Sequence, residues 1–101
     1  MIKLYNTNLE TNKLESVDTY TRGTWIHMVD PSEEEIKEVC QNVNIKEDFI
    51  RYALDNEEKA RIDVEDEDDT ILFIIDIPVI EKSQSGGYMY ATMPIGMIVV
   101  R

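Results

Sequence analysis

The chain has 101 residues, the size of one small domain. Lysine and arginine together number 10 and aspartate and glutamate 21, which gives a formal net charge of −11. This charge repels phosphate backbones and anionic membrane surfaces, so it argues against nucleic acid as a partner and favours cations. Solubility alone also explains such a surface.

Cysteine and histidine occur once each, as Cys40 and His27. A lone cysteine forms no disulfide within the chain, which indicates a reducing compartment, and the two residues are too few for a tetrahedral zinc site. We expect Cys40 to be a buried structural thiol and His27 to be a strand residue with a satisfied side chain. Because the sequence places no nucleophile beside a base, we expect no enzymatic activity.

No segment of the chain is typical of an export signal or a membrane helix. Met1–Tyr5 lacks the apolar core of a signal peptide. The apolar stretch Ile71–Ile80 has about half the length that a membrane helix needs. We therefore expect a soluble chain.

The first third of the chain is expected to hold three short strands. Ile2–Leu4 is typical of a strand that enters a turn at Asn6–Asn8, and Leu14–Val17 is its expected hairpin partner. Trp25–Val29 is a third strand, which ends where a helix begins.

Two helices are predicted next. Asp30 is the expected N-cap of the first helix, with Pro31 at the first helical position and Glu33 closing a capping box. This helix extends to about Asn42 and has one apolar stripe, made of Ile36, Val39, Cys40 and Val43. The second helix spans about Lys46–Leu54 and directs four residues toward the core, namely Phe49, Ile50, Ala53 and Leu54.

The rest of the chain is predicted to consist of strands. Ala60–Glu65 alternates apolar and charged residues, as a half-buried strand does. Thr70–Ile77 is almost continuously apolar, which favours a central strand covered on both faces. A turn at Ser83–Gly87 leads into Tyr88–Val100, which returns as strand.

This order of elements predicts an α+β fold with α/β-type layers, in which two helices from the N-terminal half pack on a mixed, mostly antiparallel sheet. Tyr88 and Tyr90 share one face of their strand and are expected to pack in that sheet. The chain stops at Val99–Arg101, inside a strand, so we expect a domain truncated before its remaining strands and helices.

The acidic run Asp63–Asp69 is the obvious candidate for a metal site. A calcium-binding EF-hand loop that started at Asp63 would need glycine where Asp68 stands and glutamate where Ile74 stands. The run is therefore interpreted as a hairpin turn with solvated carboxylates.

Five short motifs, taken together and in this order, resemble the N-terminal domain of the CorA family of magnesium transporters. They are Trp25-Ile26-His27-Met28 followed by Pro31–Ile36, Tyr52-Ala53-Leu54-Asp55, Glu57–Glu65, Leu72–Pro78 and Tyr90–Val99. The resemblance covers residues 25–99. The family's Gly-Met-Asn signature, at the end of its first transmembrane helix, is absent, because Gly96-Met97 is followed by Ile98.

The resemblance implies that residues 1–101 are a partial N-terminal cytoplasmic domain with neither a pore nor a transmembrane segment. The full-length protein would be a multi-pass homopentamer, with this part on the cytoplasmic side of the cell membrane and attached to it only through the missing C-terminal part. Divalent cations bound between neighbouring cytoplasmic domains would hold the pore closed. The ion would be Mg²⁺, as regulator and cargo, or Co²⁺, Ni²⁺ or Zn²⁺. The fragment alone would be a monomer or an edge-paired dimer.

The resemblance also implies a regulatory metal site. Asp55 matches the family's metal-site aspartate between subunits, and Glu57 and Glu58 are weaker expected helpers. Family members often carry a second acid directly before that aspartate, where this chain has Leu54, which leaves a second site open. Capping of the helix end is the alternative role of Asp55.

A function of a different class also stays open. The chain could be a free-standing acidic protein-interaction domain that pairs with a partner through the exposed sheet edge after Val100.

Overall fold

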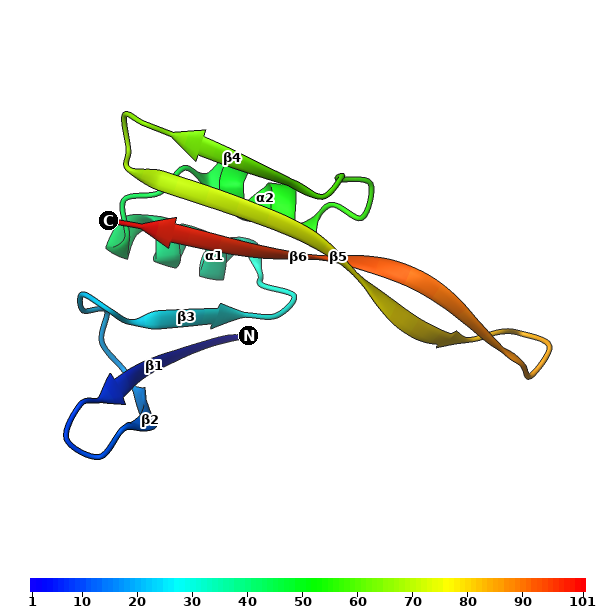
Figure 1. Ribbon diagram of the computed structural model, residues 1–101, viewed down its shortest axis with the longest axis horizontal. Coiled ribbons are helices and arrows are strands. Elements are labelled where there is room, and N and C mark those ends of the chain that lie inside the picture. Colours follow the sequence, from blue (N-terminus) through cyan, green and yellow to red (C-terminus); the bar gives the residue numbers. More distant parts are fainter. The chain divides into compact units, whose positions relative to one another are not determined.

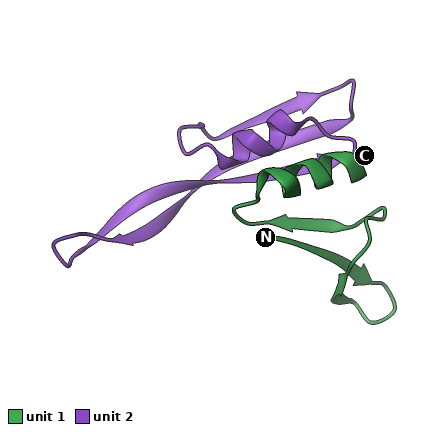
Figure 2. Cartoon of the chain, turned by 180° about the vertical axis from the view of Figure 1, so that it is seen from behind, with its two compact units in different colours: residues 1–43 green, residues 44–101 purple.

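The computed structural model describes all residues from Met1 to Arg101, and the chain forms two compact units. Unit 1 is Met1–Val43 and unit 2 is Asn44–Arg101 (Figure 2). Each unit contains its own sheet, so the position of any candidate site is set by the elements of one unit.

Unit 1 contains three strands and one helix. The strands are antiparallel and form a sheet in the order β2-β1-β3, and the elements are β1 (Ile2–Asn8), β2 (Lys13–Val17), β3 (Trp25–Met28) and α1 (Glu33–Asn42). β1 continues through the predicted turn at Asn6–Asn8, and the turn follows it. The turn begins after Asn8 because the Asn8 Oδ1 accepts hydrogen bonds from the N–H groups of Glu10 and Thr11.

The predicted start of the first helix is wrong by two residues. Ser32, not Asp30, is the N-cap, and Glu35, not Glu33, completes the capping box. The Ser32 Oγ accepts from the Glu35 N–H at 3.2 Å, and the Glu35 carboxylate accepts from the Ser32 N–H at 2.9 Å. Asp30 takes a positive φ of 43° in the preceding turn. The Ser-x-x-Glu spacing was present in the sequence and outcompetes the cap at Asp30.

Unit 2 contains one helix and three strands, two of which have 13 residues each. They are α2 (Glu47–Leu54), β4 (Arg61–Glu65), β5 (Thr70–Lys82) and β6 (Tyr88–Val100), with strand order β4-β5-β6 (Figure 1). Both strand pairs are antiparallel, and the central position predicted for β5 is confirmed. β5 and β6 stay paired over 13 residues, so the hairpin extends beyond the end of β4 (Figure 1).

Helix α2 covers one face of this sheet. Phe49 packs with Leu72 and Ile74 of β5, and Tyr52 and Ile98 are partly buried against them. Truncating a buried leucine such as Leu72 costs about 2–5 kcal/mol in comparable cores. The prediction that Leu54 faces this core is wrong, because it lies on the last turn of α2 with its side chain exposed.

The apolar residues of strand β4 lie on the opposite face from the one expected for a half-buried strand. Ile62 pairs with Phe73 and Val64 with Ile71, which places both on the face that α2 does not cover. The α2 side instead receives Arg61, whose guanidinium lies 5.1 Å from the centre of the Tyr52 ring. On the α2 side of β4, Arg61 has the Tyr52 ring and nearby carboxylates as partners.

Two further expectations for the hairpin are wrong. β5 is covered on one face only, since its odd-numbered residues have no helix above them, and Ile75 is 53% exposed. Tyr88 and Tyr90 do not pack in the sheet but project into solvent from the far end of the hairpin. That end is a two-stranded ribbon, which has no layer against which to bury a side chain.

The predicted α+β class is confirmed, with two helices and only antiparallel strand pairs. The strands divide into two three-stranded sheets, whereas the sequence predicts one mixed sheet. The two helices lie between the first three and the last three strands along the chain. Each group of three strands pairs within itself, with strands that are near in sequence.

The fit between α2 and β6 depends on Gly96. A methyl group added to Gly96 would overlap the Ala53 Cβ and lie 3.3 Å from the Ala53 Cα. We expect Gly96→Ala to lower the free energy of unfolding by about 1–3 kcal/mol, because the helix would have to move off the sheet. Urea denaturation followed by circular dichroism measures this loss.

Gly87→Ala is the matched control, since a methyl group there meets only the Ser83 Oγ at an ordinary 3.6 Å. Equal losses for the two variants would show that the contact between Gly96 and Ala53 does not limit the approach of the helix.

Candidate cation-binding residues at the end of helix α2

Asp55 is the C-cap of helix α2, at the exposed point where the helix gives way to a turn. Its N–H donates to the Tyr52 carbonyl at 3.3 Å, and its Oδ1 accepts from the Glu57 N–H at 2.9 Å. Its carbonyl also accepts from the Glu58 N–H at 3.1 Å. The structure therefore confirms the helix-end position predicted for Asp55 and shows the capping role that the sequence left as the alternative. One carboxylate oxygen is engaged in the turn, and the group as a whole faces solvent.

Glu57 and Glu58 follow Asp55 in the same turn but differ in their surroundings. Glu57 is exposed, and its N–H is tied to Asp55. Glu58 is half-buried and forms an ion pair with Arg61. Of the two predicted helpers, Glu57 therefore has an open carboxylate and Glu58 is committed to a cation of the chain itself.

Arg61 is bound on two sides by carboxylates. Its Nε donates to the Asp63 Oδ2 at 2.8 Å, and its terminal nitrogen pairs with Glu58. These bonds, the one to Asp63 foremost, raise the pKa of Arg61 above its already high ordinary value. The guanidinium remains charged at every pH at which the protein is folded, so the two carboxylates beside it are permanently offset.

The acidic turn after β4 is also partly offset by a cation of the chain. The Lys46 Nζ lies 3.5 Å from a Glu65 oxygen and 3.6 Å from an Asp68 oxygen. The charge of Glu65, followed by that of Asp68, raises the pKa of Lys46. Asp69 ends the turn with a positive φ of 49°. This geometry agrees with the interpretation of the run as a hairpin turn.

No three His, Cys, Asp or Glu side chains of the chain converge closely enough to hold a metal ion. Asp55 and Glu57 are thus the exposed candidate ligands at this turn, and the contact that joins them is the hydrogen bond from the Glu57 N–H to the Asp55 carboxylate. A cation bound there would complete its coordination with water or with ligands from another molecule, as Mg²⁺ does when it keeps several of its waters.

His27 and Cys40 lie in different settings. The His27 ring contacts Trp25 edge-on, with ring centres 5.6 Å apart, on the same face of β3. Cys40 lies on α1 and is half-buried.

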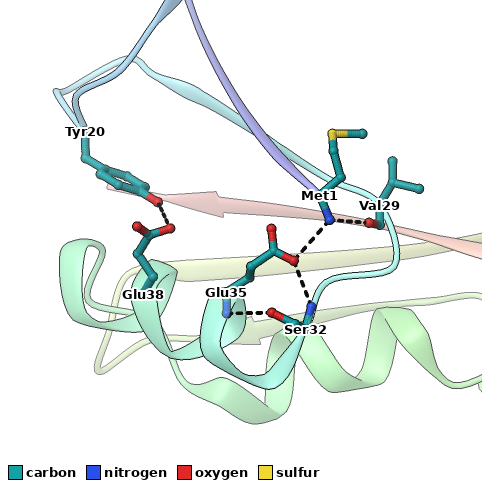
Figure 3. A network of polar contacts seen from close by, with 6 residues as sticks. All are labelled: Met1, Tyr20, Val29, Ser32, Glu35 and Glu38. Atoms are coloured by element: carbon teal, nitrogen blue, oxygen red, sulfur yellow. Dashed lines mark hydrogen bonds and ion pairs between the residues drawn. The ribbon is translucent and has the colours of Figure 1, made fainter.

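A polar network in unit 1 was missed by the reasoning from sequence. The Met1 ammonium donates to the Val29 carbonyl at 2.8 Å and to the Glu35 Oε1 at 3.1 Å, and the same carboxylate closes the capping box with Ser32 (Figure 3). Glu35 therefore joins the start of β1 to the start of α1. The Ser-x-x-Glu spacing was a sequence signal for the capping box between Ser32 and Glu35. No local signal indicates the contact of the Met1 ammonium with Glu35, because the two residues are 34 positions apart.

A second contact in the same unit joins Tyr20 to Glu38 of α1, with 3.2 Å between the hydroxyl and the carboxylate (Figure 3). Burial, followed by the charge of Glu38, raises the pKa of Tyr20. The tyrosine therefore stays a neutral donor to the carboxylate at ordinary pH.

Comparison with solved structures relates this fold to a transporter. The chain is similar to the structure of the CorA magnesium transporter from Methanocaldococcus jannaschii, with a TM-score of 0.74 and 18% sequence identity. The similarity covers 100% of this chain and 30% of the transporter chain. No protein-family model and no curated protein sequence matches the chain. The CorA resemblance predicted from the motifs is thus confirmed at the level of the fold.

Neither helix of the chain has the length and apolar character that crossing a membrane requires.

The Glu35 network predicts acid sensitivity in unit 1. The Ser32 N–H and then the Met1 ammonium hold the pKa of Glu35 below its ordinary 4.5. Because this pKa is lowered on folding, the stabilisation is complete above the ordinary pKa and is lost as the pH falls through the lower value of the folded state. We expect Glu35→Gln to lower the melting temperature at neutral pH. The variant should also lose less of its melting temperature than the unsubstituted chain when the pH falls from about 6 to about 3.

The matched control is Glu34→Gln, in the same first turn of α1 and exposed. Thermal unfolding across the pH series, followed by circular dichroism, compares the three proteins. A Glu35→Gln profile parallel to that of the unsubstituted chain would remove Glu35 as the source of the acid response.

Proposed function

We propose that this chain is the cation-sensing regulatory part of a CorA-like divalent-cation transporter, acting on the cytoplasmic side of the membrane and carrying no enzymatic activity. The observation that carries the proposal is the similarity of the whole chain to 30% of a CorA magnesium transporter. The CorA resemblance implies a pore in the remainder of such a protein, and we assign this part the response to the cation.

The charge of the chain supports this role. A net charge of −11 makes copies of the chain repel one another, and a divalent cation between two acidic surfaces removes that repulsion. Arg61 and Lys46 already offset several carboxylates of unit 2, whereas Asp55 and Glu57 face solvent. The exposed turn after α2 therefore offers an added cation two carboxylates that no cation of the chain offsets.

The regulatory ligand is Mg²⁺, bound by Asp55 with Glu57 as a weaker helper. Oxygen ligands of this kind suit hard cations, and a site with few protein ligands holds Mg²⁺ through its water shell. In a homopentamer the missing ligands come from the neighbouring subunit. Binding between subunits favours one arrangement of the assembly over another, so the occupancy of the site reports the free cation concentration.

A second candidate function rests on the edge of the sheet in unit 2. β6 pairs with β5 on one side only, so its other side presents backbone groups to solvent along a 13-residue strand. Such an edge can accept a strand from another protein, which is the basis of an interaction domain.

The proposal predicts saturable Mg²⁺ binding that depends on the charge of Asp55. Asp55→Asn keeps an oxygen that can accept from the Glu57 N–H but removes the charge, so the turn is kept while the ligand is weakened. We expect Mg²⁺ to shift the backbone amide signals of Asp55 and Glu57 in two-dimensional NMR spectra, and Asp55→Asn to raise the dissociation constant at least about tenfold.

Asp66→Asn is the control, since it removes one exposed charge from the acidic turn and leaves the end of α2 unchanged. Equal weakening by both variants would mean that Mg²⁺ responds to the overall charge of the chain and that Asp55 is not a ligand.

A further inference from the structure

A polar pocket in unit 1 lies where the pairing of β1 with β2 ends. The first pair of this ladder is Leu4 with Val17, so Ile2 and Lys3 have β3 on one side and no strand on the other. The chain leaves β2 after Val17 and reaches α1 through the contact of the Tyr20 hydroxyl with a carboxylate of that helix (Figure 3). A pocket of ≈ 270 Å³ lies between these segments.

The floor of this pocket is aliphatic. Leu4 and Val17 are cross-strand partners and therefore point to the same side of the sheet, and Ile2 lies two positions before Leu4 on that side. Lys3 and Ser16 also line the pocket, but the alternation along their strands directs their side chains to the other face, so they line it with backbone atoms. A ligand in the pocket therefore meets hydrocarbon at its floor.

The rim of the pocket carries two carboxylates. Asp18 lies in the bend after β2 and Glu38 on α1, and both are exposed. No ion pair of the chain involves either of them, in contrast to the carboxylates beside Arg61 and Lys46. The Tyr20 hydroxyl donates to one Glu38 oxygen at 3.2 Å, which leaves the other oxygen open. The rim therefore offers two negative charges that are not offset within the chain.

An anionic rim above an aliphatic floor selects one kind of cation. A primary ammonium group has three N–H donors and no acceptor, so carboxylate oxygens satisfy it. Its alkyl chain gains by covering apolar side chains, as the stems of lysine residues do. A hydrated metal ion has the charge but gains nothing from hydrocarbon, and an anion is repelled by the rim and by the net charge of −11. Two carboxylates match two ammonium groups, and the pocket is smaller than the about 300 Å³ of drug-sized sites.

We propose that this pocket binds a small aliphatic diamine, with its alkyl chain on the three aliphatic residues of the floor and its ammonium groups at Asp18 and Glu38. The pocket belongs to unit 1, whereas Asp55 and Glu57 belong to unit 2, so the diamine site is separate from the proposed Mg²⁺ ligands. It also does not depend on the proposed transporter role. Because both attractions at the rim are between charges, added salt weakens the binding.

The experiment is a titration of the 101-residue chain with 1,4-diaminobutane, followed by two-dimensional NMR. We expect saturable shifts of the methyl signals of Leu4 and Val17 and of the backbone amide signals of Asp18 and Glu38. Glu38→Gln is expected to raise the dissociation constant at least about tenfold. This variant keeps an oxygen that accepts from the Tyr20 hydroxyl, so the contact between the loop and α1 remains while the charge is lost.

Two controls separate the pocket from the general charge of the chain. Glu34→Gln removes the same charge from an exposed position of the same helix, outside the pocket, and should leave the dissociation constant almost unchanged. Titration with Mg²⁺ in place of the diamine should leave the methyl signals of Leu4 and Val17 where they are. Circular dichroism confirms that each variant is folded.

Three outcomes would overturn the proposal. Shifts that do not saturate would show that the pocket has no affinity for a diamine. Equal weakening by Glu34→Gln and Glu38→Gln would show that the amine responds to net charge alone. Shifts of the same methyl signals with Mg²⁺ would show that the pocket accepts any divalent cation. The Mg²⁺ response at Asp55 is read from other signals, so each of these results leaves the proposed function to its own test.

Discussion

The approach of helix α2 to strand β6, made at Gly96 against Ala53, is the constraint on which unit 2 depends. A glycine at this point lets the helix lie on the sheet closely enough for Phe49 to reach Leu72 and Ile74. Any side chain there would lift the helix and open the small core. A unit of this size has only one small core. The close contact between Gly96 and Ala53 therefore sets the position of α2 and of the residues at its end.

The same packing fixes the electrostatics at the helix end. With α2 in place, Tyr52 holds Arg61, and Arg61 in turn takes up the charges of Glu58 and Asp63. The acidic surplus of the chain is therefore uneven. Carboxylates beside Arg61 and Lys46 are offset within the chain, while those of Asp55 and Glu57 remain open to solvent. Local pairing, more than total charge, decides where an external cation can bind.

Covering one face of the sheet with a single helix leaves the other face bare. β5 is apolar on both sides, yet only its even-numbered residues near Leu72 are buried under α2. The charged residues of β4 turn toward the helix, where they have partners, which sends Ile62 and Val64 outward. The chain thus presents two kinds of exposed surface in unit 2, the open carboxylates of Asp55 and Glu57 at the end of α2 and the apolar face of the sheet opposite α2.

The sequence by itself determined the class of fold, the two helices, the turn at Ser83–Gly87 and the place of Asp55 at a helix end, because these follow from periodicity, turn residues and motif order over short spans. Only the tertiary structure decided the rest. The orientation of β4 places Arg61 beside Tyr52 of α2 and its apolar residues on the other side, and the ion pair of Glu58 with Arg61 commits that carboxylate. The contact of Met1 with Glu35 joins residues far apart in the chain. Local patterns report the neighbours along the chain, whereas burial and pairing are set by neighbours in space.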